Sequence, residues 1–179
     1  MKAKDIIIQI DEKKTNPLRA IAHVVKKEEF GSKHLKDIVE TMQKALAKEN
    51  DGVALAAPQI GLSLRIFVVS PSAYPEDAKN KPLVFINPKI VKASKKKAEM
   101  QEGCLSVRWI YGTTKRSISA TIEAYDMDGN KFSYGASGLI AHIFQHECDH
   151  LEGILFIDHG FNLEEYTEEE VKAGQMGKK

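Results

Sequence analysis

Apolar side chains recur at helical spacing in two stretches of the chain. In the first stretch they are three or four residues apart, at Leu35, Ile38, Val39, Met42 and Leu46. Ser32 is a typical N-cap residue, and the turn-forming residues 50–52 end the pattern. The spacing therefore predicts an amphipathic helix that begins after Ser32.

The second stretch is more apolar and lies near the C-terminal end. Ser137 is positioned to cap it, and Gly153 is a natural stop. Its apolar positions are Leu139, Ile140, Ile143, Phe144 and Leu151. A helix with this composition is buried, and we expect the apolar residues 154–157 after it to form a short buried strand.

Alternation with period two predicts strands between the two helices. Residues 118–124 alternate like a half-buried antiparallel strand, and the turn at residues 126–130 leads to a partner strand. Shorter apolar runs predict further strands at residues 6–10, 64–69, 83–86 and from residue 90. We expect the strand at 83–86 to end at Asn87-Pro88. The pattern predicts an α+β fold in which antiparallel sheets pack around one central helix.

Composition places few further limits. The 179 residues are 42% hydrophobic and carry a net charge of +1, which favours one domain and argues against binding nucleic acid or an acidic membrane. We find no run long enough to span a bilayer and no signal peptide, so we expect a cytoplasmic protein. Two cysteines, Cys104 and Cys148, are too few for a disulfide framework.

The second helix carries the candidate chemistry. His146 and His150 are four residues apart, so their imidazoles share one face and can bind one ion. Glu147 lies beside them, in the HExxH arrangement of metal hydrolases whose glutamate moves protons. The alternative is a pair of core histidines that are bonded to backbone carbonyls.

Cys104 is a candidate third ligand. A thiolate and two imidazoles leave a fourth position open for water, as in catalytic sites that use zinc or ferrous iron. If the helix motif is left aside, the sequence around Cys104 is more typical of a buried structural thiol. The small residues at 52–57 allow a close approach of the backbone, although a simple turn has the same pattern.

Three separated motifs together resemble the peptide deformylase family. They are GVALAAPQ at residues 52–59, EGCLS at 102–106 and QHECDH at 145–150, in the order of the family's own motifs. The resemblance implies a hydrolase that removes the N-formyl group from the initiator methionine of nascent polypeptides and releases formate. It also implies formylmethionyl peptides as partners.

The resemblance also implies roles for individual residues. Cys104, His146 and His150 would bind one divalent ion, which is Fe2+ in much of the family, with Zn2+ or Ni2+ as alternatives after purification. Glu147 would be the proton carrier, and the Gln59 side chain and the Leu105 backbone N–H would face the formyl oxygen. The implied substrate-binding residues are Gly52, Val53, Ala54, Gly103, His142 and Ile143. Glu102 and Arg116 would form a buried ion pair that braces the cysteine loop.

Several positions depart from the family pattern. Ala54 replaces a glycine, which is costly if the backbone there needs positive φ. His142 stands where an apolar residue is expected in the methionine pocket, and Arg108-Trp109 replaces a proline and a small residue. We divide the chain into a catalytic domain at residues 1–162 and an acidic tail at residues 163–179. Because phosphate backbones would repel that tail, we expect it not to dock on the ribosome.

Three other interpretations compete with a deformylase. Ala54 and His142 favour a related metal hydrolase with an altered N-acyl or peptide substrate. A zinc endopeptidase would need a downstream third ligand, for which only His159, Glu164 and Glu165 are available. A non-catalytic, metal-stabilised binding domain would not need Glu147.

Overall fold

The computed structural model describes residues 7–11 and 16–174. Its helices are α1 (Lys33–Leu46), α2 (Gly138–Leu151) and the short α3 (Glu168–Lys172). Its strands are β1 (Ala54–Ala56), β2 (Ile66–Val69), β3 (Val84–Ala93), β4 (Lys97–Cys104), β5 (Val107–Ser117), β6 (Ser119–Tyr125), β7 (Lys131–Ser137) and β8 (Phe161–Glu165).

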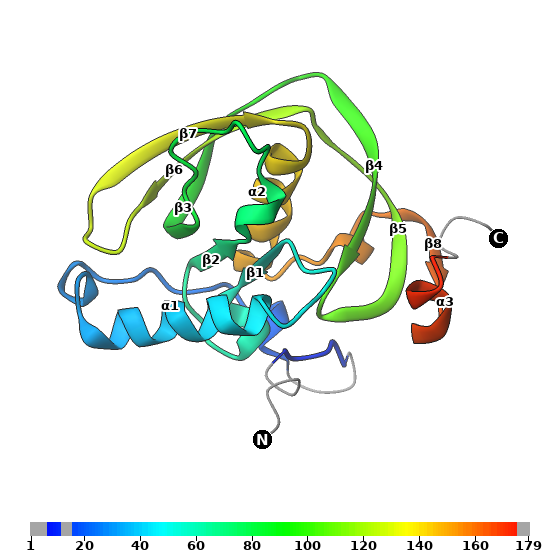
Figure 1. Ribbon diagram of the computed structural model, residues 1–179, viewed down its shortest axis with the longest axis horizontal. Helices are drawn as coiled ribbons and strands as arrows, with labels where there is room; N and C mark the ends of the chain where they lie inside the picture. The colour runs from blue at the N-terminus through cyan, green and yellow to red at the C-terminus, as the bar shows by residue number, and fades with distance from the viewer. Residues whose placement is uncertain (1–6, 12–15, 175–179) are drawn as a thin grey trace.

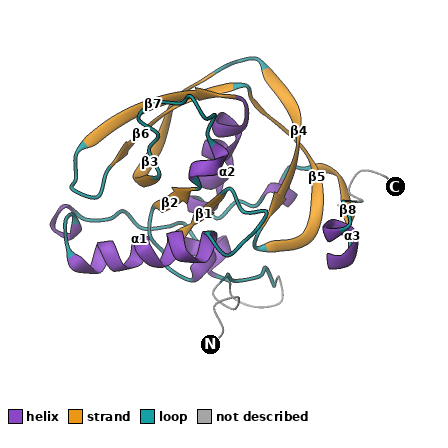
Figure 2. Cartoon of the chain, viewed as in Figure 1, coloured by secondary structure: helices purple, strands orange, loops and turns teal. Residues whose placement is uncertain are grey.

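The strands form two antiparallel sheets with α2 between them. One sheet has the order β1-β2-β3-β6-β7 and the other the order β4-β5-β8. Figure 1 shows α2 at the centre of the molecule, with β3, β6 and β7 on one side and β4 and β5 on the other. In Figure 2 the strands surround this helix, and α1 lies below them. The predicted α+β class, with antiparallel sheets around a central helix, is confirmed.

Helix α1 forms as its sequence predicts and packs near β1 and β2. The Ser32 hydroxyl accepts a hydrogen bond from the Leu35 N–H at 3.1 Å, which satisfies one of the free donors of the first turn. The five predicted apolar positions are all buried. The helix ends at Leu46, before the turn-forming residues that we expected to end it.

Helix α2 is fixed by aromatic packing. Phe144 lies in the main core, 5.2 Å between ring centroids from Phe85, which in turn stacks on Phe67 at 4.4 Å. Burying one such ring stabilises the fold by about 1.5–3 kcal/mol. Gly153 stops the helix with φ +73°, and a Cβ there would lie 2.6 Å from the Arg19 carbonyl oxygen. Ser137 occupies the N-cap position, but its side chain accepts no capping hydrogen bond.

Two of the predicted strands are wrong, and a third has a different end. Strand β3 does not end at Asn87-Pro88: it continues to Ala93 through two register shifts, and Asn87 adopts φ +49°. The apolar run at 154–157 contains a 3-10 helix, Phe156–Asp158, in place of a strand. A strand was also expected at residues 6–10, but residues 7–10 form no strand. The backbone N–H groups of Ile8 and Ile10 nevertheless donate hydrogen bonds to the carbonyl oxygens of Gln59 and Ser106. Residue 6 lies outside the described residues.

The C-terminal residues continue the smaller sheet. Strand β8 pairs with β5, so that Tyr111 lies opposite Glu164, and α3 follows it. The boundary that we placed after residue 162 therefore falls inside β8, and the division into domain and tail stays a prediction. No helix within residues 7–11 and 16–174 combines the length and the apolar character that crossing a bilayer requires.

Candidate active site

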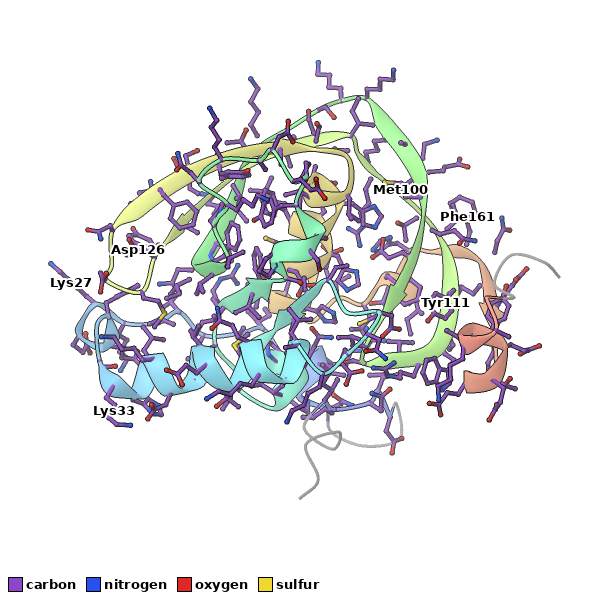
Figure 3. All side chains as sticks on the ribbon, viewed as in Figure 1. Lys27, Lys33, Met100, Tyr111, Asp126 and Phe161 are labelled. Carbon is purple, nitrogen blue, oxygen red and sulfur yellow. The ribbon has the colours of Figure 1, made fainter. Side chains whose placement is uncertain are left out.

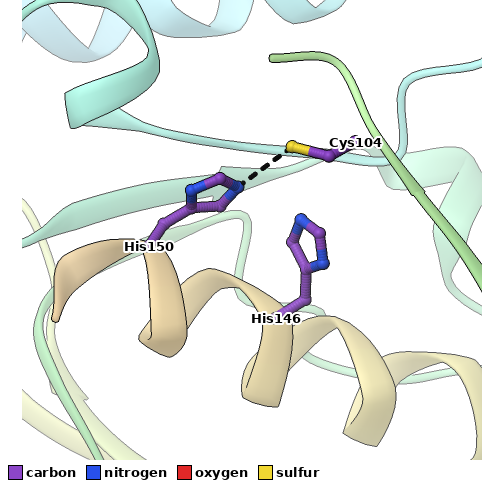
Figure 4. Close-up of side chains that lie close together, drawn as sticks. All are labelled: Cys104, His146 and His150. Atoms are coloured by element: carbon purple, nitrogen blue, oxygen red, sulfur yellow. Dashed lines mark hydrogen bonds between the residues drawn. The ribbon is translucent and has the colours of Figure 1, made fainter. Parts of the chain in front are cut away.

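Cys104, His146 and His150 converge in the space between β4 and α2. The two histidines are one turn apart on α2, with ring centroids 4.8 Å apart. The Cys104 Sγ atom lies 3.2 Å from Nε2 of His150, and Figure 4 shows both rings facing the cysteine. One ligand atom from each of the three residues lies within 4.8 Å of the others. These residues could therefore hold one metal ion.

The chemistry of the donors fits a divalent ion. His146 directs Nδ1 to Oε1 of Glu102 at 2.5 Å, which leaves its Nε2 for a metal. This carboxylate–histidine arrangement orients the ring and raises its basicity as a ligand. A thiolate and two imidazoles are a regular ligand set for zinc or ferrous iron. His159, Glu164 and Glu165, the ligands a zinc endopeptidase would need, are not part of this group.

The Glu102 carboxylate is the centre of a buried hydrogen-bond network. Arg116 donates to both of its oxygens, from Nε at 2.8 Å and Nη2 at 2.7 Å, and the hydroxyl of Thr114 donates to Oε2. Burial opposes the charge of Glu102, but Arg116, His142 and His146, which lie around the carboxylate, hold its pKa well below its usual range. Glu102 and Arg116 are only 6% and 7% exposed, so the pair is buried as expected.

Arg116 also connects the smaller sheet to the central helix. Its Nη1 atom lies 2.8 Å from Oδ2 of Asp149 on α2. Because Arg116 sits on β5 and Glu102 on β4, the two ion pairs link the β4–β5 hairpin to α2. This linkage fixes Cys104 relative to the two histidines.

Glu147 is the buried carboxylate beside the three candidate ligands. It is 3% exposed, and its Oε2 atom has no hydrogen-bond partner among the described residues. Burial raises the pKa of Glu147 to about 7, while the neighbouring His146 lowers it. A carboxyl group with this pKa gains and loses a proton near neutral pH, as a general acid–base requires.

A cleft with a volume of about 310 Å³ runs past these residues. All the predicted site residues except His150 line it, namely Gly52, Val53, Ala54, Gln59, Gly103, Cys104, Leu105, His142, Ile143, His146 and Glu147. His150 is buried, with 1% exposure, and contacts Cys104. We call the part around Glu102, His142 and Glu147 the inner end, and the part lined by Asp51, Arg108 and Val171 the outer end.

Gln59 has a fixed side chain next to the cysteine. Its Oε1 atom accepts a hydrogen bond from the Ala56 N–H at 2.8 Å, which directs its Nε2 atom toward Cys104 Sγ at 3.5 Å and Ser106 Oγ at 3.2 Å. The amide N–H groups of Gln59 are thus positioned at the candidate metal site.

Ala54 and His142, two of the positions that depart from the family pattern, have different structural consequences. Ala54 is an extended residue of β1 paired with Val69, and it is not among the non-glycine residues with positive φ, so the backbone strain that we considered is absent there. His142 is buried in the cleft wall, with Nε2 only 2.6 Å from Oε2 of Glu102. The ring is close enough to interact with this carboxylate, although it lacks the alignment of a regular hydrogen bond.

Sequence reasoning missed several residues of the cleft, which are Asp51, Gln101, Val107, Arg108, Tyr111, Leu139 and Val171. Tyr111 lies opposite Gly103 in the β4–β5 hairpin, a pairing that hairpin register could have indicated. Val171 gave no local signal, because it reaches the cleft only through the pairing of β8 with β5.

Comparisons with known proteins agree with this geometry. The sequence profile of the polypeptide deformylase family matches residues 5–166. Peptide deformylase 1B of Arabidopsis thaliana is 45% identical over 125 residues, which are 70% of this chain and 45% of that protein. The peptide deformylase of Desulforudis audaxviator is 42% identical over 122 residues, 68% of this chain and 72% of that protein.

A solved structure has the same fold. It is the class I type b peptide deformylase of Acinetobacter baumannii with Met-Ala-Ser bound, which superposes with a TM-score of 0.75 at 31% identity. The superposition covers 86% of this chain and 97% of that one. Deformylases remove the N-formyl group from nascent peptides, and this chain belongs to the peptide deformylase family.

Proposed function

We propose that this chain is a metal-dependent peptide deformylase that hydrolyses the N-formyl group of initiator formylmethionine and releases formate. The observation that carries the proposal is the grouping of Cys104, His146 and His150 beside the buried Glu147 in one cleft. We propose a cytoplasmic location, as the sequence analysis expects.

Cys104, His146 and His150 would hold a single divalent ion, and we propose Fe2+ as the working ion. Zinc and nickel bind such ligands more tightly than ferrous iron, so either can replace it during purification. When bound, the ion polarises a carbonyl oxygen and lowers the pKa of water.

Glu147 would carry the proton during hydrolysis. Its raised pKa lets the carboxylate accept a proton from the attacking water and then deliver that proton to the leaving amine. The Nε2 atom of Gln59 and the backbone N–H of Leu105 would face the formyl oxygen, where negative charge develops. One such preorganised donor is typically worth about 3 kcal/mol of barrier.

The peptide would lie between two strand edges. Strand β1 forms the edge of the five-stranded sheet, and β4 forms the edge of the three-stranded sheet. The backbone at Gly52, Val53 and Ala54 on one side and Gly103 on the other would bind the peptide main chain in the manner of an added strand.

A second candidate is a deformylase with an altered substrate preference. The specific observation is the buried imidazole of His142, which makes part of the inner end polar. Such a pocket favours methionine less strongly than a wholly apolar one would. The reaction would stay the same, and the preferred first residue of the peptide would change.

The test is formate release from formyl-Met-Ala-Ser by protein purified without oxygen and reloaded with Fe2+. We expect the parent protein to release formate. Removing the metal with a chelator should abolish this activity, and adding Fe2+ should restore it. Parallel assays with acetyl-Met-Ala-Ser and with formyl peptides that begin with other residues separate the two candidates. Failure of the folded, metal-loaded parent to release formate from any of these formyl peptides would contradict both.

A further inference from the structure

The first described segment of the chain, residues 7–11, is bonded to two loops of the candidate active site. The Ile8 N–H donates to the Gln59 carbonyl oxygen at 2.8 Å, and the Ile10 N–H donates to the Ser106 carbonyl oxygen at 2.9 Å. In Figure 3 this segment runs in blue below the turn between β4 and β5. One short segment thus holds the backbone of the glutamine loop and of the cysteine loop.

Gln9 binds the turn between β4 and β5 with its side chain. Its Nε2 atom donates to the Leu105 carbonyl oxygen at 2.8 Å, and its Oε1 atom accepts from the Arg108 N–H at 3.3 Å. Gln9 is exposed and does not line the cleft. Any effect of this side chain on the candidate metal site must therefore pass through the turn that it holds.

The peptide bond between Leu105 and Ser106 is the central peptide of this turn, since Cys104 and Val107 pair on either side of it. Common turn types differ in the direction of their central peptide, which can therefore flip unless another group holds it. On the side opposite the Leu105 carbonyl, the Ser106 N–H donates to Cys104 Sγ at 3.5 Å. Because a peptide bond is planar and trans, the bond from Gln9 to the carbonyl also fixes the direction of this N–H.

The Cys104 sulfur accepts a second hydrogen bond from the Gln59 side chain, whose Nε2 atom lies 3.5 Å from Sγ. Residues 8–10 therefore contact both loops that donate N–H groups to this sulfur. Hydrogen bonds to a ligating sulfur tune the electronic properties of a metal site, and partners beyond the ligands orient them.

We infer that Gln9 is a positioning residue for the Cys104 thiolate, and that it acts by orienting the peptide bond between Leu105 and Ser106. The inference rests on the proposed function, because it takes Cys104 as a metal ligand. The bond from Gln9 keeps the Ser106 N–H directed at the sulfur, and it holds the cysteine turn in the conformation that meets the two histidines of α2.

The experiment uses protein loaded with Co2+, because a thiolate bound to Co2+ gives a charge-transfer band that reports on hydrogen bonding to the sulfur. Gln9→Met keeps the length of the side chain and removes both of its hydrogen bonds. We expect the band to move to longer wavelength, since a sulfur that has lost a hydrogen bond gives electrons to the metal more readily. Because the turn is less firmly held, the Co2+ dissociation constant should rise about fivefold, which corresponds to about 1 kcal/mol, the usual net contribution of one hydrogen bond.

Gln9→Glu separates the two contacts of the side chain. It keeps an acceptor for the Arg108 N–H and loses the donor to the Leu105 carbonyl, so it should shift the band as Gln9→Met does. Gln43→Met is the matched control, because Gln43 is an exposed residue of α1 that does not line the cleft. Its band and its Co2+ dissociation constant should equal those of the parent.

A band at the parent's position in Gln9→Met, or a shift in Gln9→Met that Gln9→Glu does not reproduce, would overturn the inference alone. A parent protein that shows the thiolate band but, when loaded with Fe2+, releases no formate from formyl-Met-Ala-Ser would contradict the proposed function and leave the role of Gln9 standing. A Co2+-loaded parent without any thiolate band would contradict both.

Discussion

The two ends of the cleft are built from the same kinds of charged residues in different surroundings. At the inner end Glu102 and Arg116 are 6% and 7% exposed. At the outer end the Arg108 and Asp51 side chains are 20% and 47% exposed. Water screens the outer charges, whereas the inner charges depend on one another. The candidate metal site therefore depends on a few buried charge contacts, and the loss of any one of them should be costly. The outer end depends on more exposed charge pairs, each of which should contribute little.

The largest effect is expected from Cys104→Ala. Losing only an outer-sphere partner of a metal ligand typically lowers metal affinity by 10–100-fold, so losing the ligand itself should lower it by more than about 100-fold. Elemental analysis of dialysed protein should find the variant almost free of metal, and formate release should fall with it. A variant that kept one tightly bound ion per chain would place the metal elsewhere.

The next prediction compares the two ends directly. Glu102→Gln leaves Arg116 buried without its full counter-charge, so we expect the free energy of unfolding to fall by about 3–5 kcal/mol. The metal affinity should fall by about 10–100-fold, since His146 loses its carboxylate partner. Denaturant titration and metal titration measure the two quantities.

Glu49→Gln is the matched control at the outer end. It removes the carboxylate that pairs with Arg108, and the two side chains are 20% and 13% exposed, against 7% and 3% for Arg116 and Glu102. We expect a loss of about 1 kcal/mol or less and no change in metal affinity. Equal losses of unfolding free energy for Glu49→Gln and Glu102→Gln would contradict the proposed difference between the two ends.

A smaller effect is expected from His142→Leu, which makes the wall of the inner end apolar. The kcat/KM ratio of formyl-Met-Ala-Ser over formyl-Gln-Ala-Ser should rise by about tenfold, the usual size of discrimination by an apolar pocket. Because Glu102 keeps its bonds from Arg116 and His146, metal content should hold at one ion per chain. A ratio identical to the parent's would show that His142 does not face the substrate.

The smallest effect is expected at the surface pair of Arg19 and Asp158, which lie 2.7 Å apart, with side chains 29% and 38% exposed. Burial alone would raise the pKa of Asp158, but Arg19 holds it below its ordinary value of 3.8. The pair therefore stabilises the fold above the unfolded-state pKa, and this contribution is lost as pH falls through the folded-state pKa.

Asp158→Asn measures that contribution. It should cost less than about 1 kcal/mol at pH 7, and the difference from the parent should shrink as the pH drops below the ordinary pKa of the carboxyl group. Urea titrations at pH 7 and pH 3 measure both quantities. A gap that widened toward low pH would reverse the assigned sign.

Local patterns predicted much of the fold and most of the inner end. The caps and spacing around Ser32 and Gly153 located α1 and α2, because helix signals lie within a few residues of one another. The same spacing placed His146 and His150 on one face. Cys104 could be assigned to the same site as these histidines, because the motifs of the cysteine and of the histidines occur in the order found in the peptide deformylase family.

The errors arose from ambiguous local patterns, and the omission of Val171 from a non-local contact. Asn87-Pro88 looked like a strand end, but Asn87 tolerates the positive φ found in it, and the strand continues beyond the pair. The apolar run at 154–157 was too short to distinguish a strand from a helical turn. Val171 reaches the cleft only because β8 pairs with β5, and no pattern near residue 171 reveals that pairing.

The most direct test of the account is formate release and metal content measured together on Glu147→Gln. The account predicts one ion per chain, as in the parent, with formate release from formyl-Met-Ala-Ser lowered by at least about 100-fold, the lower limit usually found for a general acid–base. A variant that held its metal and turned over at the parent's rate would contradict the role of Glu147, and with it the proposed mechanism.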